Sequence, residues 1–116
     1  MDNRKTDSYY IGKMIADLRF ILTHTEGRTQ EQMEDDEVLM DSVMFRLIQI
    51  SENAERLTEK CKVRHPSVPW RAIKGLRNRI VHEYGNVDLG VVYETVQNDL
   101  PALLCDLEQV AEYRTE

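Results

Sequence analysis

Apolar residues recur at intervals of three and four along most of the chain, the spacing that gathers side chains on one face of an α-helix. The first series predicts a helix from about Ser8 to His24, with Gly27 in the exit turn. An acidic stretch follows, in which Thr29 is placed to cap the next helix. We interpret that stretch as a solvated first turn. The first series consists of Ile11, Ile15, Leu18 and Leu22.

The longest helix is predicted from about Gln30 or Val38 to Lys62. Its apolar stripe is broad, which indicates both core packing and a surface for a partner. Three polar residues, Ser51, Glu52 and Asn53, interrupt the stripe. Either they are exposed to solvent, or one of them faces a functional site. The stripe consists of Val43, Leu47, Ile50, Ala54, Leu57 and Cys61, widened by Met40, Met44 and Ile48.

Two prolines in the segment 65–70 end this helical stretch and deliver Trp70 into a third helix, predicted to end at Val81 or Glu83. His65 is interpreted as a loop residue. Gly75 costs about 1 kcal/mol relative to alanine inside a helix, so we expect another backbone or a ligand to come close there.

A turn at residues 85–86 and an N-cap at Asp88 begin the last helix, whose apolar series runs from Leu89 to Val110. Asp99 and Pro101 are expected to kink or restart it. No segment has the pattern of a strand. The sequence therefore predicts an all-α bundle of four to five helices.

The length of 116 residues predicts a single domain, residues 1–116, small enough to be stabilised by a second copy. No apolar run is long enough to span a bilayer, and the polar start, Met1 to Ser8, does not suit a signal peptide. We therefore expect a cytoplasmic protein with no membrane partner. Cys61 and Cys105 are expected to be reduced core thiols. The three histidines are scattered without the spacing of metal ligands, so no metal or other cofactor is expected.

The net charge of −6 argues against a nucleic-acid partner, but the distribution of charge changes the picture. The segment Lys60–His82 holds seven of the 15 Lys and Arg residues and none of the 21 acidic residues. Such a segment either forms a patch that attracts phosphate or is an ordinary solvated basic face.

Candidate chemistry lies at the end of this segment, where Arg77, His82 and Tyr84 have the spacing Arg-x4-His-x-Tyr. Arginine binds phosphate, and histidine moves protons near neutral pH, so the pair suits metal-independent RNA cleavage. On a straight helix Arg77 and His82 lie about 140° apart, whereas Asn78 and His82 share a face. Either the helix loosens before His82, or a second copy completes the site. A simpler interpretation is that His82 caps the helix and Arg77 forms a surface ion pair.

The chain resembles the HepT-like toxins, a HEPN-domain family also described as DUF86-type. The resemblance covers nearly the whole chain and is carried by segments 45–54, 69–70, 75–84, 87–88 and 98–101. It implies a HEPN-like helical bundle that forms a homodimer. It also implies a ribonuclease toxin of a type VII-like toxin–antitoxin pair, with an RNA substrate and a minimal nucleotidyltransferase (MNT-type) antitoxin.

By this resemblance Arg77 and His82 are the catalytic pair, and Tyr84 is the residue that the antitoxin modifies by AMPylation. We expect Asn78, Arg79 and Glu52 to support the pair. Ser51 stands where the family often has glycine, and Glu83 places an acid beside the histidine. Two alternatives stay open: a non-catalytic binding partner of a nucleotidyltransferase, and a structural protein that only dimerises.

Overall fold

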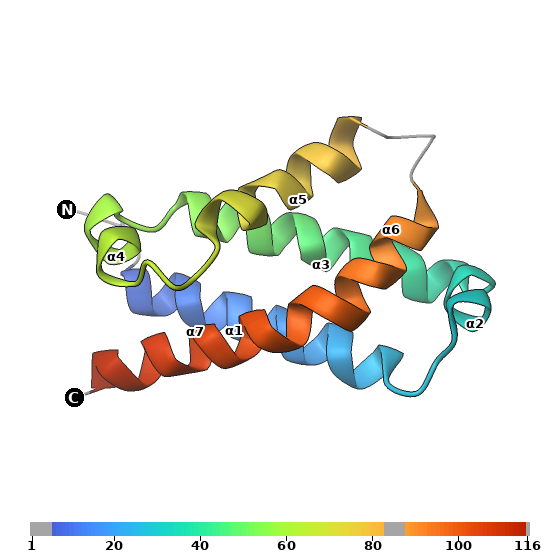
Figure 1. Ribbon diagram of the computed structural model, residues 1–116, viewed down its shortest axis with the longest axis horizontal. Helices are drawn as coiled ribbons and strands as arrows, with labels where there is room; N and C mark the ends of the chain where they lie inside the picture. Colours follow the sequence, from blue (N-terminus) through green and yellow to red (C-terminus); the bar gives the residue numbers. More distant parts are fainter. Residues whose placement is uncertain (1–5, 83–87, 116) are drawn as a thin grey trace.

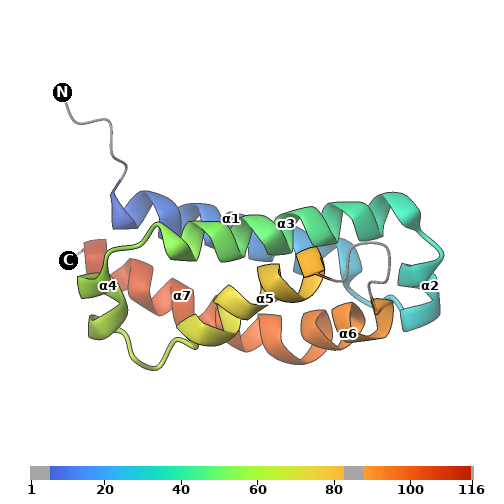
Figure 2. The ribbon, with the colours of Figure 1, turned by 90° about the horizontal axis from the view of Figure 1, so that it is seen from above.

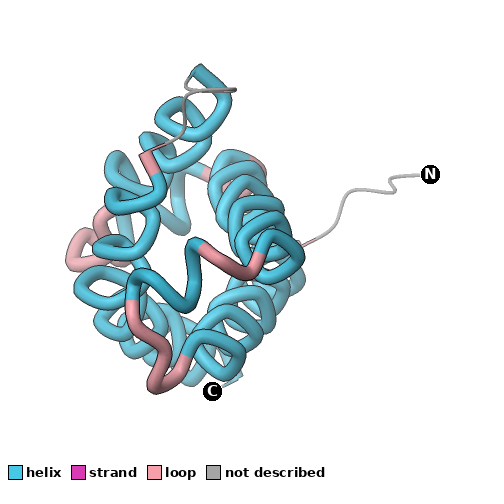
Figure 3. The backbone as a smooth tube through the Cα atoms, turned by 90° about the vertical axis from the view of Figure 1, so that its right-hand side faces the viewer, coloured by secondary structure: helices cyan, strands magenta, loops and turns pink. Residues whose placement is uncertain are grey.

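The computed structural model describes residues 6–82 and 88–115, with side chains for residues 6–79 and 88–111. Within these ranges all regular structure is helical and no strand occurs, which confirms the predicted all-α fold (Figure 3). The elements are α1 (Asp7–Thr25), α2 (Gln30–Glu34), α3 (Glu37–Glu55), α4 (Glu59–Arg64), α5 (Trp70–His82), α6 (Leu89–Glu94), the π-helical turn η1 (Thr95–Asp99) and α7 (Leu100–Thr115).

Four long segments form the bundle: α1, α3, α5 and the continuous run α6–η1–α7 (Figure 1). Successive long segments run in opposite directions, and α1 packs against both α3 and α7 while α5 packs on α3. The short helix α4 lies at the end of the bundle where α7 finishes, and α2 closes the opposite end against α3 and α6 (Figure 2). This is the alternating order expected of a helical bundle with short connections.

One apolar core joins the four long segments. The predicted helical series account for most of it, and they leave Leu22 half-buried at its edge. The largest fully buried side chains are Ile11, Met14, Leu18, Ile21, Met33, Leu47, Ile50, Ile73, Leu100, Leu107, Val43 and Val96.

The helix ends follow the sequence signals closely. Thr29 caps α2 in a capping box with Gln32, and Asp88 caps α6 by accepting from the backbone N–H of Gly90 at 2.9 Å. Gly27 adopts φ of 74° after α1, a left-handed conformation that glycine reaches at little cost. The Trp70 indole N–H donates to the carbonyls of Lys62 and His65, which fixes the turn between α4 and α5.

The prediction of one helix continuing to Lys62 is wrong, because α3 ends at Glu55 and α4 begins at Glu59. Thr58 caps α4 by accepting from the backbone N–H of Cys61 at 3.1 Å. The Asp7 carboxylate accepts from the Thr58 N–H at 2.9 Å and from its hydroxyl at 2.7 Å. The break therefore depends partly on a residue 51 positions away, which the local apolar spacing does not reveal.

The two cysteines have different environments. Cys61 is buried as expected, but Cys105 is exposed, so its assignment to the core is wrong. In α7 the buried residues Leu103 and Leu107 lie two positions to either side of Cys105, which places the thiol on the opposite face of the helix.

The disturbance predicted near Asp99 and Pro101 takes the form of the π-helical turn η1. Proline has no backbone N–H, and its ring crowds the carbonyl four residues earlier, so a widened turn just before Pro101 relieves the conflict. In the ranges that the structure describes, no helix combines the length and apolar character needed to cross a bilayer.

Candidate functional site

Among the described side chains, polar interactions connect helix α5 with α3. Arg77 Nε lies 3.5 Å from Glu52 Oε1, and Lys74 Nζ lies 3.7 Å from Glu55 Oε1. The Ser51 hydroxyl donates to the Lys74 carbonyl at 3.2 Å. Because the residue number rises along α5 as it falls along α3, the two helices run antiparallel, and successive turns of each carry one ion pair.

Arg77 lies at the exposed edge of this contact. Its side chain is 47% exposed and that of Glu52 is 43% exposed. An ion pair of this length and exposure contributes little to stability. A phosphate oxygen can therefore replace the Glu52 carboxylate on the guanidinium without a large loss of folding free energy.

The polar residues of α3 have three different positions. Ser51 and Asn53 are buried, so the expectation of an exposed trio is wrong for these two. Asn53 accepts from the Arg56 guanidinium at 3.2 Å. Glu52 is the member that faces Arg77, as the alternative interpretation held.

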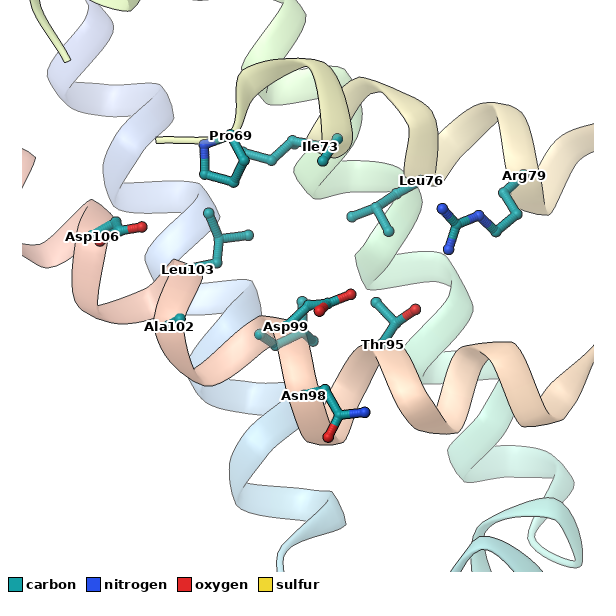
Figure 4. A pocket seen from close by; sticks show the side chains of 12 residues that line it. Pro69, Ile73, Leu76, Arg79, Thr95, Asn98, Asp99, Ala102, Leu103 and Asp106 are labelled. Carbon is teal, nitrogen blue, oxygen red and sulfur yellow. The ribbon is translucent and has the colours of Figure 1, made fainter. Parts of the chain in front are cut away.

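Arg79 lies on the other side of α5 from Arg77, because two helical steps correspond to about 200°. It lines a cavity of about 330 Å³ between α5 and the η1–α7 segment (Figure 4). Leu76 and Leu103 form part of the apolar lining, and Asp99 and Asp106 add carboxylates. The structure thus brings Glu52 to Arg77 and separates Arg79 from both.

The remaining predicted site residues are less completely described. Asn78 is exposed on α5, and His82 is the last residue of that helix. The His82 side chain, Glu83 and Tyr84 lie outside the described part. The backbone remains α-helical through residue 82, so the loosening considered from the sequence is absent from the described helix. The pairing of Arg77 with His82, and its completion by a second copy, stay predictions.

The basic segment is largely on the surface. Six of its seven Lys and Arg side chains are exposed, and only Lys62 is half-buried. Glu52 and Glu55 of α3 pair with Arg77 and Lys74, so the positive charge is partly balanced where α5 meets α3. Over residues 6–79 and 88–111, no three His, Cys, Asp or Glu side chains gather as a metal site would require.

A groove lies beside the Arg77–Glu52 pair, and it was not predicted from the sequence. It has a volume of about 470 Å³ and lies between α1 and α3; we call it the α1–α3 groove. Glu52, the partner of Arg77, belongs to its lining. Its nine lining residues are Tyr9, Tyr10, Lys13, Phe45, Ile48, Gln49, Glu52, Asn53 and Arg56.

Comparison with known proteins gives the family. A profile described as "Ribonuclease HepT-like" matches residues 14–110. A relative named "Putative RNase" from Caldanaerobacter subterraneus subsp. tengcongensis is 26% identical over 91% of this chain and 95% of its own. The "Probable ribonuclease HepT" of Thermococcus cleftensis is 27% identical over 83% of this chain and 91% of its own.

A third relative, from Methanocaldococcus jannaschii, is named "Gamma-glutamylcyclotransferase and putative RNase". It is 25% identical over 94% of this chain, which corresponds to 49% of the longer relative. No solved structure gave a significant match. The family profile covers most of the bundle, from α1 to α7, and the chain therefore belongs to the HepT-like ribonuclease family.

Proposed function

We propose that this protein is a ribonuclease toxin that cleaves RNA without a metal ion, with Arg77 and His82 as its catalytic residues. Membership of the HepT-like ribonuclease family is the observation that carries the proposal. The exposed, weakly paired guanidinium of Arg77 supports it, because a phosphate can take the place of Glu52.

The reaction uses the ribose 2′-hydroxyl as its nucleophile, which makes it specific for RNA. A base, His82 in one copy, takes the 2′-hydroxyl proton as the oxygen bonds to phosphorus. The bond from phosphorus to the 5′-oxygen breaks, and that oxygen receives a proton from an imidazolium or water. Arg77 stabilises the charge on the phosphoryl oxygens. The products are a 2′,3′-cyclic phosphate and a 5′-hydroxyl.

The active unit in this proposal is a homodimer. Arg77 and position 82 lie about 140° apart on one straight helix, so a single α5 presents them to different sides. In a twofold dimer, Arg77 of one copy can meet His82 of the other. Asn78 shares a helical face with position 82, whereas Arg79 is assigned to a more distant supporting role.

Regulation is proposed to act through Tyr84, two residues beyond His82. An MNT-type antitoxin would transfer AMP from ATP: the phenol oxygen attacks the α-phosphorus, and pyrophosphate leaves. The new phosphodiester would attract Arg77, and the nucleoside would fill space that the RNA backbone needs. Activity falls by both effects.

One observation favours a second candidate, a non-catalytic helical partner of a nucleotidyltransferase. Arg77 already has Glu52 as a partner at 3.5 Å, in a contact between α3 and α5 that needs no RNA. In this candidate the Arg77–Glu52 pair serves the contact between α3 and α5 and takes no part in catalysis.

The test is expression in bacteria of the wild type and of Arg77→Ala and His82→Ala, with RNA cleavage by the purified proteins in the presence of a chelator. We expect the wild type to arrest growth and cut RNA, and each variant to lose both effects by more than tenfold while remaining folded. Arg28→Ala is the matched control, because Arg28 pairs with Asp36 away from the site.

Co-expression with the neighbouring nucleotidyltransferase completes the experiment. Intact mass should increase by one or more adenylyl groups on the wild type and not on Tyr84→Phe. Equal toxicity of all variants would rule out the assigned catalytic roles. A folded wild type that neither arrests growth nor cuts RNA would instead support the binding partner.

A further inference from the structure

The α1–α3 groove combines two exposed aromatic side chains from neighbouring helices. Phe45 of α3 is 58% exposed and Tyr9 of α1 is 45% exposed. The Tyr9 ring meets the Tyr10 ring edge-to-face, with centroids 5.3 Å apart. Large aromatic surfaces held on rigid helices at the protein surface are suited to stacking against flat, polarisable rings.

The groove also has polar groups suited to a nucleic acid. Lys13 and Arg56 are exposed and supply positive charge. The Arg56 guanidinium donates to Asn53 Oδ1, which orients it within the lining. Gln49 is half-buried in the lining and provides an amide that can both donate to and accept from a base edge.

The balance of charge in the lining favours an anionic ligand. Among the nine lining residues Glu52 is the one acid, against the two cations Lys13 and Arg56. A hollow at the start of α3 has the opposite character, because Asp35, Asp36 and Glu37 line it with a single arginine. Aromatic surface and net positive charge therefore coincide in the α1–α3 groove and not in that hollow.

The groove is continuous with the proposed catalytic arginine. Glu52 belongs to the groove and lies 3.5 Å from Arg77 Nε, so an RNA phosphate that replaces this carboxylate would stand at the end of the groove. The nucleotide next to that phosphate would then reach the aromatic side chains. The arrangement matches the common design of single-strand binding sites, in which bases stack on aromatics and basic residues follow the backbone.

We propose that the α1–α3 groove binds one or two unpaired bases of the RNA substrate, with Phe45 as the stacking platform and Lys13 and Arg56 as phosphate contacts. This inference rests on the proposed ribonuclease function and specifies the form of its substrate. Duplex RNA would bind poorly, because its bases are stacked on one another and cannot reach Phe45.

The test measures binding of a fluorescent single-stranded 2′-O-methyl RNA, which lacks the attacking hydroxyl, by anisotropy. We compare wild type with Phe45→Leu, which keeps an apolar side chain, and Phe45→Trp, which keeps an aromatic one. Loss of one stacked base weakens binding about 5- to 150-fold, so Phe45→Leu should raise the Kd by a factor within this range. Phe45→Trp should bind RNA with wild-type affinity or more tightly. Val38→Ala, an exposed apolar residue of α3 outside the groove, should leave the Kd unchanged.

The proposed phosphate contacts are tested through the salt dependence of RNA binding. Lys13→Gln and Arg56→Gln should each reduce the slope of log Kd against log salt concentration by about one, because each removes one phosphate contact. Arg28→Gln, which lines the acidic hollow, should leave the slope as it is.

Two results would overturn the inference. One is an unchanged Kd and KM for Phe45→Leu in a protein that cuts RNA, which leaves the proposed function intact. The other is dissociation of a dimer by Phe45→Leu, with RNA affinity lost only as far as the dimer is lost, which assigns the groove to contact between copies. If the wild type neither binds nor cuts RNA, the proposed function fails together with this inference.

Discussion

Asp17 of α1 is a buried carboxylate in a helix contact. Its side chain is 3% exposed, and Oδ1 accepts from the Arg46 guanidinium at 2.8 Å. No donor among the described residues reaches Oδ2, which is also buried. Arg46 in turn lies over the Phe20 ring, with 3.8 Å from its Cζ to the ring centroid. One arginine therefore compensates the Asp17 charge and covers an aromatic ring.

We predict that Arg46→Gln lowers the free energy of unfolding by about 3 kcal/mol, because it leaves the Asp17 charge buried without its cationic partner. Chemical denaturation measures this loss. The control is Arg19→Gln, which breaks the exposed ion pair between Arg19 and Glu108 and should cost less than about 1 kcal/mol. Equal losses in the two variants would contradict the role assigned to burial.

At single residues the sequence predicted one contact of the candidate site and missed a surface beside it. It singled out Arg77 and connected it with Glu52, and the ion pair joins these two residues. It did not single out Phe45 as part of a surface groove, because a broad apolar stripe does not say which part other helices leave uncovered. The assigned roles of His82 and Tyr84 remain predictions.

At the scale of elements, the expectation that another backbone comes close to Gly75 can be compared with the structure. A Cβ built at this position meets nothing within 4 Å, so within the described chain no neighbouring backbone explains the glycine. Gly12, inside α1, has the same free space. Both glycines therefore lower helix stability without a packing reason in the described part of the chain.

We predict that Gly75→Ala and Gly12→Ala each raise the free energy of unfolding by about 1 kcal/mol, from the helix propensity of alanine. Thermal and chemical denaturation check this. Gly90→Ala should not gain, since its Cβ would lie 3.1 Å from the capping Asp88 Oδ1. If Gly75→Ala stabilises the protein yet lowers RNA cleavage, while Gly12→Ala does not, a ligand or second copy approaches Gly75. A destabilised Gly75→Ala would contradict the free space seen here.

Helix identity and capping followed from local sequence, whereas the junction between α3 and α4 did not. Thr29 and Asp88 are local signals, because each is an N-cap whose hydrogen bonds are made within three residues along the chain. The break before Thr58 is fixed in part by Asp7 from the far end of α1. Because Leu57 and Cys61 are both buried, the apolar series continues across the break and conceals it.

At the scale of the whole molecule, the bundle presents its candidate chemistry on two sides of α5. Arg77 faces α3 and the α1–α3 groove, and Arg79 faces the cavity beside α7. The spacing of Arg77 and His82 is visible in the sequence, whereas their proposed meeting depends on contacts between copies, which the sequence of one chain does not reveal. A catalytic site shared between two chains is the arrangement that this geometry favours.

We therefore predict a dimer in solution at micromolar concentration, measured by light scattering, whose active site takes Arg77 from one copy and His82 from the other. Arg77→Ala and His82→Ala proteins, each inactive, should recover activity when they are mixed and allowed to exchange subunits. Half of the dimers would then be mixed, and each would hold one complete site of two, so about a quarter of wild-type activity should return. Mixing either variant with itself is the control. A stable monomer, or a stable dimer that exchanges subunits yet recovers no activity, would show that the two residues are not shared between chains in this way.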